Sequence, residues 1–273
     1  FSTSNLVNSS GVVAANVTGV GTARRSLAAS SYGGDKAFFA FGNSGGSTKV
    51  NTKNLVNNSG VVGADVTGVG TARQNLASAS YGGDKAIVAY GNSGSLSNLS
   101  NLVSNSGVVA TDTTGVGTAR ADMAGVKYGS DKAIFAYGYS NQNLSLSNLV
   151  TSLGVVGTDV SGVGTARETQ AAPYGVDTAA AAYGQGDSGY LNVKNLINNS
   201  GVVGADVSGV GTARYGVGSA GYGGDKGIFA YGATGSILSM SNLMNNVGVI
   251  AADVSGVGTA RRYGVAAGYS TSA

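Results

Sequence analysis

The sequence of 273 residues contains no cysteine, no histidine and no tryptophan, and only one proline. Without cysteine the chain can form neither disulfides nor thiolate sites, so it does not depend on an oxidising compartment. Without histidine it lacks the commonest general base and the commonest metal ligand of proteins. We therefore expect no enzyme activity, no metal site and no cofactor.

Long apolar runs and a basic stripe are missing as well. No stretch approaches the roughly 18 apolar residues of a membrane span, and the N-terminal residues do not resemble a signal peptide. The formal net charge is only +3, and most charges recur at fixed positions with both signs interspersed. We expect neither membrane insertion nor nucleic-acid binding. Because the chain starts at Phe1, we expect a processed protein or a piece of a longer one.

Glycine is abundant, with 47 residues, and the chain is repetitive. The hexapeptide Gly-Val-Gly-Thr-Ala-Arg, here called the sextet, occurs six times, and successive copies end 49, 47, 47, 47 and 47 residues apart. A fixed period in this range predicts a repeat architecture. The six sextets end at Arg24, Arg73, Arg120, Arg167, Arg214 and Arg261.

Each copy has room for four short strands around its sextet. Large apolar residues occur in adjacent pairs, as at Ile134–Phe135 and Val108–Val109. Successive strand residues point to opposite faces, so these pairs predict sheets that are covered on both sides. Four-stranded sheets packed face to face around an axis meet this demand, and the Ala, Ser and Gly run after each sextet suits a crowded inner strand.

We therefore predict an all-β fold, a six-bladed β-propeller of four-stranded antiparallel blades, as a single domain over residues 1–273. A β-solenoid is the alternative, but it would have atypical capping copies at its ends, whereas the first and last copies here are ordinary. Six full periods would need about 282 residues. We expect the closing blade, shared by the two chain ends, to lack its second strand or to borrow it from residues or a chain outside this sequence.

The order of parts resembles the kelch repeat of galactose-oxidase-like propellers: an arginine before a small-residue strand, a Tyr-Gly-Gly-Asp hairpin, and an aromatic strand ending in glycine. It differs in having one glycine where kelch strands usually end in two, and in lacking tryptophan. The repeats are also similar to those of predicted phage and marine-virus tail or surface proteins. The resemblance implies a structural or adhesion protein of a virion, a tail fibre or another extracellular assembly. The copper chemistry of galactose oxidase would need histidine ligands.

The repeated motifs favour structural roles. The sextet imitates a dinucleotide-binding fingerprint, but six tandem copies without helical patterning indicate a structural turn. We expect its arginine to pair with a repeated aspartate or to cap carbonyls between blades. One aspartate per turn is too few for a calcium loop. The acids outside the repeat framework, Asp122, Glu168 and Asp187, lie in different sequence settings, so paired-carboxylate hydrolysis is not expected.

Differences among the copies carry the remaining functional signal. They concentrate after the sextet and after the second strand, two positions that open on one face of a propeller. Exposed aromatics beside polar side chains suit protein partners or surface glycans. We expect a non-catalytic structural or adhesion module with this variable face as its contact surface; a soluble multivalent lectin is the alternative, and neutral loop drift would give the same variation. The candidate contact residues are Tyr139, Gln142, Tyr190, Tyr215, Tyr263, Arg25, Arg262 and Glu168.

The fourth copy departs from the others inside the framework. It has Ala179–Ala182 where other copies carry large apolar side chains such as Ile-Phe. Each large-to-alanine difference in a core costs about 2 to 5 kcal/mol unless the space is refilled. Either a neighbouring blade or a partner fills the space, or this blade is the weakest.

Overall fold

The computed structural model describes residues 2–270, and this part of the chain is all-β. It forms five three-stranded antiparallel sheets and one two-stranded hairpin. Among the described residues no helix is long and apolar enough to cross a membrane. The strands are β1 (Ala28–Tyr32), β2 (Lys36–Ala40) and β5 (Lys53–Val56); β6 (Ala77–Tyr81), β7 (Lys85–Ala89) and β8 (Ser100–Val103); β9 (Ala124–Tyr128), β10 (Lys132–Ala136) and β11 (Ser147–Val150); β12 (Glu168–Tyr174), β13 (Thr178–Gly186) and β14 (Gly189–Ile197); β15 (Gly218–Tyr222), β16 (Lys226–Ala230) and β17 (Ser241–Met244); and the hairpin β3 (Asn43–Gly45) with β4 (Thr48–Lys49).

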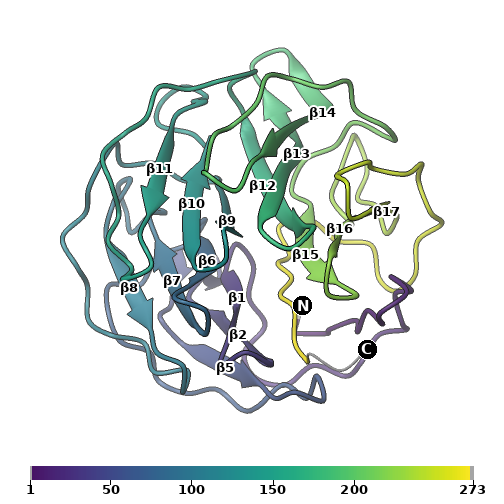
Figure 1. The fold of residues 1–273 in the computed structure, drawn as a ribbon. Helices are drawn as coiled ribbons and strands as arrows, with labels where there is room; N and C mark the ends of the chain where they lie inside the picture. The colour runs from purple at the N-terminus through teal and green to yellow at the C-terminus, as the bar shows by residue number, and fades with distance from the viewer. Residues whose placement is uncertain (1, 271–273) are drawn as a thin grey trace.

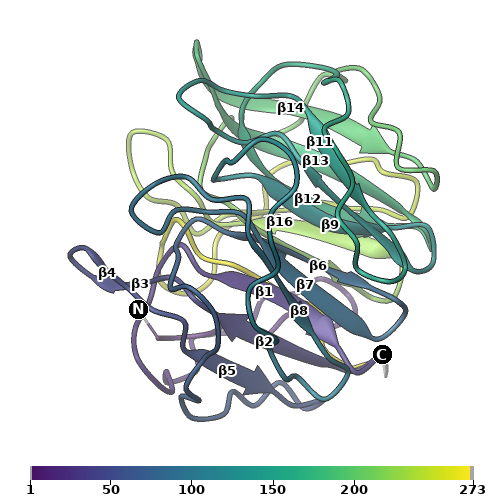
Figure 2. The same cartoon turned by 90° about the vertical axis from the view of Figure 1, so that its left-hand side faces the viewer.

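The five sheets follow one another around a common centre (Figure 1). The first strand of each sheet lies nearest the centre and the third lies outside, and neighbouring first strands contact one another in the order β1, β6, β9, β12 and β15. The side view shows neighbouring sheets layered against each other (Figure 2). Small residues on the first strands allow this close approach near the centre.

The predicted hairpin between the first and second strands is present. In the first sheet Tyr32 pairs with Lys36, and Gly33 and Gly34 between them have φ values of 62° and 82°. Glycine adopts this left-handed conformation without a Cβ penalty.

The prediction of four strands per copy is wrong in detail, because each sheet has three strands. The fourth segment is attached by two isolated bridges; in the first sheet these are Val56 with Val62 and Lys53 with Val66. Between the bridges the Asn54 side chain donates to the Gly63 carbonyl (3.0 Å). A side chain thus occupies the place where main-chain ladder bonds would continue.

The prediction that adjacent apolar pairs mark sheets covered on both sides is confirmed for the middle strands and is wrong for the outermost segments. Ile134 and Phe135 on the middle strand β10 are 1% and 0% exposed, as expected. Val109 is 4% exposed, but Val108 beside it is 59% exposed, because the outermost segment has no sheet against its outer side. The same exposed valine recurs in every copy at 54–61% exposure, and we call the set the rim valines: Val12, Val61, Val108, Val155, Val202 and Val249.

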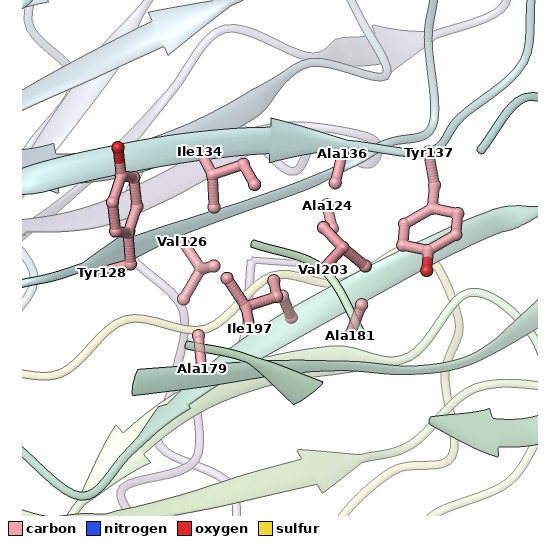
Figure 3. Packing of buried hydrophobic residues seen from close by; sticks show 11 residues of the cluster. Ala124, Val126, Tyr128, Ile134, Ala136, Tyr137, Ala179, Ala181, Ile197 and Val203 are labelled. Carbon is pink, nitrogen blue, oxygen red and sulfur yellow. The ribbon is translucent and has the colours of Figure 1, made fainter. Parts of the chain in front are cut away.

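The alanines of the fourth copy are fully buried. Ala179 and Ala181 on β13 pack with Val126 and Ile134 of the preceding sheet and with Ile197 of their own (Figure 3). Ala180 and Ala182 belong to a second cluster with side chains of the following sheet. The four alanines therefore pack against large side chains of both neighbouring sheets.

The sextet arginine joins two sheets. Arg120 is fully buried and donates from Nε to the carbonyl of Tyr137 (2.9 Å) and from Nη2 to that of Phe135 (3.3 Å), both in the sheet that follows it. Its guanidinium also lies 4.4 Å from the ring centre of Tyr90 in the preceding sheet. Such cation–π contacts strengthen when they are shielded from water. Arg167 and Arg214 repeat the carbonyl bonds, which are the carbonyl caps expected from the sequence.

The other sextet residues fix the outer segment. The main-chain N–H and the hydroxyl of Thr118 both donate to Asp159 Oδ2 (3.1 and 2.6 Å). Burial works against this carboxylate, but the bonds from Thr118 and Asn148 outweigh it and keep the pKa of Asp159 below its usual value. The repeated aspartate therefore binds chiefly the sextet threonine and its neighbouring asparagine.

The first sextet glycine allows a close main-chain approach. A Cβ built on Gly209 would lie only 1.4 Å from the carbonyl oxygen of Asn192. This glycine is required because no side chain of any size fits there.

Candidate functional site

The two sets of variable segments lie together at one end of the sheets. The residue after the sextet pairs with the residue after the second strand's terminal glycine, as in Arg25 with Asn43 and Ala121 with Tyr139. In the fourth copy the same pairing, Glu168 with Gln185, is part of the sheet. We keep the name variable face for this end.

Main-chain hydrogen bonds link the copies around the centre at this end. The residue two positions after each sextet arginine takes part, and we call this ring the collar. Its residues Ser26, Asn75, Asp122 and Tyr263 have φ values of 54–57°, an uncommon left-handed conformation for residues with side chains. The bonds are Asn75 N–H to Ser26 O, Asp122 N–H to Asn75 O, Thr169 N–H to Asp122 O, Tyr263 N–H to Gly216 O and Ser26 N–H to Tyr263 O, at 2.8–3.2 Å.

Three tyrosines and an arginine form a cluster beside the collar, here called the tyrosine cluster. The rings of Tyr190 and Tyr215 are stacked with centres 4.9 Å apart, and Tyr263 meets Tyr215 edge to face at 5.7 Å. The Arg262 guanidinium lies 5.5 Å from the ring centre of Tyr215, and it donates to the Tyr215 hydroxyl. The sequence predicted all four as contact residues, and the structure brings them together.

Two carboxyl groups lie within electrostatic range of this cluster. Burial raises the pKa of Asp122 to about 6, against the effect of a hydrogen bond from Asn75. Burial, and then the charge of Asp122, raises the pKa of Glu168 to about 7. Burial raises the pKa of Tyr263 to about 12, with further contributions from Tyr215 and both carboxylates. The structure thus brings Asp122 and Glu168, which lie in different sequence settings, within electrostatic range of each other.

Sequence reasoning missed Asp122 as a contact residue. The available signal was its position two residues after a sextet arginine, the position that forms the collar in the other copies. Its backbone is left-handed, burial raises the pKa of its carboxyl group, and its charge in turn raises the pKa of Glu168.

The remaining candidates lie on the same face outside the tyrosine cluster. Tyr139 is 39% exposed and pairs through its main chain with Ala121 and Asn143. Gln142 is exposed, and its carbonyl accepts from Ser140 in the same loop (2.9 Å). Arg25 is exposed and is held through its main chain by Asn43. The variable face thus has one compact aromatic and acidic region and several separate exposed side chains.

Comparison with known proteins gives no family assignment: no family model matches the chain, and no curated protein matches it.

We expect Glu168→Gln to reduce the fall in stability between pH 4.5 and 7.5. The folded-state pKa of Glu168 is raised from 4.5 to about 7, so the folded protein holds a proton that the unfolded chain releases in this range. Stability must then decline as the pH rises through this window, and glutamine removes that contribution. Repeated aspartates with a lowered pKa, such as Asp159, titrate below the window.

Urea unfolding at the two pH values measures this effect, with Asp187→Asn as a control for the loss of an exposed carboxylate on the same face. An unchanged pH dependence in Glu168→Gln would show that Glu168 titrates normally.

Proposed function

We propose that the chain is a six-bladed β-propeller with a kelch-like order of parts, formed as one domain. Three observations support this architecture. Five three-stranded sheets follow one another around a centre, and within residues 2–270 collar bonds connect every pair of neighbouring copies except the fourth and fifth. One of these bonds joins Ser26 of the first copy to Tyr263 of the last.

We further propose that this propeller is a non-catalytic structural or adhesion module whose variable face is its contact surface. The observation that supports this proposal is that constant and variable residues have different locations within each copy. The repeated arginines, threonines and glycines hold sheets together, whereas the side chains that differ among copies gather at one end. A partner that binds this end would contact side chains that do not hold the sheets together.

A protein partner in a virion, a tail fibre or another extracellular assembly fits this proposal best. The rim valines also present one exposed apolar side chain per copy, spaced by the repeat. The variable face would then supply specificity through Arg25, Tyr139 and the tyrosine cluster.

A multivalent lectin is the second candidate, and the tyrosine cluster favours it. The stacked Tyr190, which is 41% exposed, offers an aromatic face to a sugar ring. Arg262 and the two carboxyl groups can exchange hydrogen bonds with its hydroxyls.

Binding to a glycan array separates the two candidates. A lectin should bind specific glycans, and Tyr190→Ala combined with Tyr263→Ala should weaken that binding at least about tenfold, given the energies of aromatic contacts. Val176→Ala is the control, because Val176 is 82% exposed in the hairpin between β12 and β13, at the end opposite the variable face.

An assembly module should instead bind no glycan and should co-purify with its particle or filament in fixed stoichiometry. Hydrogen exchange in that assembly should show protection at the variable face. Protection confined to the opposite end, where Tyr-Gly-Gly-Asp hairpins lie, would contradict the proposed contact surface.

A further inference from the structure

The sixth copy contains an incomplete sheet. Ser4 pairs with Val17 and Val7 with Val13, as third and fourth segments do in the other copies. Within residues 2–270, no strand lies between this pair and residues 264–270. Figure 1 shows the yellow C-terminal segment near the centre and the purple N-terminal residues at the outside.

Residues 264–270 occupy the position of a first strand. The Ser31 hydroxyl donates to the Gly268 carbonyl (2.7 Å), and between the next two copies Ser78 donates to Ala29 (2.6 Å). Ser270 N–H donates to the Asp35 carbonyl at 2.7 Å, as Gly33 does to Asp84. The first and third elements of this sheet are therefore in place.

A cavity of about 900 Å³ extends from the centre into the space between these elements. Its lining includes Arg24 and Arg261 from two sextets, Thr3 and Val7 from the third element, and Tyr269 from the first. The hydroxyl of Thr3 is buried within it and has no hydrogen-bond partner among the described residues. This cavity occupies the place of a second strand.

The five complete copies show what normally fills this place. An aromatic residue lies near the end of each second strand, and its ring lies under the sextet arginine of the next copy. The distance from the arginine Cζ to the ring centre is 3.8–5.4 Å. The glycine that follows it donates to the carbonyl of the same arginine at 2.8–2.9 Å. In four copies a tyrosine hydroxyl also donates to the sextet valine carbonyl, as Tyr90 does to Val116 (3.2 Å). Each sextet is thus the docking site for the aromatic residue and glycine near the end of the second strand of the preceding copy.

The first sextet has this docking site without its occupant. Within residues 2–270, Arg24 has no aromatic ring against its guanidinium, and no N–H donates to its carbonyl. The Val20 carbonyl likewise accepts no tyrosine hydroxyl in this part of the chain. Arg24 is only half-buried, whereas Arg73, Arg120, Arg167 and Arg214 are fully buried.

We propose that this cavity is an acceptor groove for an extended peptide with the pattern Asp-Lys-Ala-Ile-Phe-Ala-Tyr-Gly. The peptide pairs antiparallel with residues 264–270 and with Ser4–Val7, as β2 pairs with β1 and β5. Main-chain bonds provide affinity, and the alternating side chains provide specificity. Its tyrosine lies under Arg24, and its terminal glycine donates to the Arg24 carbonyl. Arg262 and Tyr263 of the tyrosine cluster line the same cavity. The docking contacts expected at Arg24 involve neither residue, so Arg24→Met tests this inference separately from the proposed contact surface.

A synthetic peptide with the sequence of residues 129–139 tests the proposal on the full chain. Titration calorimetry should show saturable binding of one peptide per chain, and saturation should raise the melting temperature, because a ligand that binds only the folded state stabilises it. A scrambled peptide should do neither. Replacing the peptide tyrosine that corresponds to Tyr137 with alanine should weaken binding at least about tenfold, since ring stacking and a hydroxyl bond are lost together.

Arg24→Met should weaken binding of the original peptide to a similar extent, whereas Lys132→Met, at an exposed lysine of another copy, should not. If Arg24→Met does not fold, the peptide variant still decides the question. Absence of saturable binding overturns the proposal, and so does binding that is insensitive to the tyrosine. Dimerisation that fills the groove with a second copy of the chain would also overturn it.

Discussion

Gly209→Ala should lower the free energy of unfolding by about 3 kcal/mol, because the new side chain would overlap main-chain atoms. The new Cβ would lie 1.4 Å from the carbonyl oxygen and 2.1 Å from the carbonyl carbon of Asn192. Both atoms belong to the main chain, so no side-chain rotation relieves the clash. Urea unfolding of the two proteins measures the loss.

Gly235→Ala is the matched control, because a Cβ on Gly235 meets nothing within 4 Å and the residue is exposed. Its stability should stay within about 0.5 kcal/mol of the parent protein. Equal losses in the two variants would mean that the first sextet glycine is not needed for close approach. Gly68→Ala should destabilise the protein as much as Gly209→Ala, because a Cβ on Gly68 would clash with Asn51 in the equivalent way.

Arg167→Met should cost about 3 kcal/mol, because it leaves buried hydrogen-bonding groups without partners. Arg167 is fully buried and donates to the Tyr183 carbonyl (3.0 Å) and to Asn195 Oδ1 (2.8 Å). Its guanidinium also lies 4.4 Å from the ring centre of Tyr137. Burial lowers the pKa of Arg167, so part of the gain from these contacts offsets desolvation of its charge.

Arg24→Met provides the comparison, since Arg24 has the same place in its sextet but is half-buried and has no ring against it among the described residues. Arg24→Met should therefore lower the free energy of unfolding by clearly less than Arg167→Met does. If methionine at both positions is tolerated equally, the bridge between sheets contributes little to stability.

The all-β class and the hairpins were predictable because they depend on local signals. Fixed spacing of the sextet sets the repeat, and Gly33-Gly34 sets a tight turn. The strand number was not predictable, since the Asn54 side chain interrupts the outer ladder only once the chain has folded. The exposure of Val108 was missed for a related reason: alternation of apolar residues does not reveal which segment lies outermost.

Comparison among the copies identified Tyr190, Tyr215 and Tyr263 as candidates, but not their mutual contacts. These residues are far apart in the sequence, and only the arrangement of the sheets brings their rings together. The influence of Asp122 on Glu168 was hidden for the same reason.

The rim valines have a consequence for the strength of any contact that they make. Each offers one small apolar side chain, and a single contact of this size binds weakly. A partner that is itself repeated would meet the same group at up to six positions on one molecule, and linked weak contacts raise the overall affinity through effective concentration. Binding of this kind is avidity, and it would tolerate the loss of one valine while failing when several are replaced together.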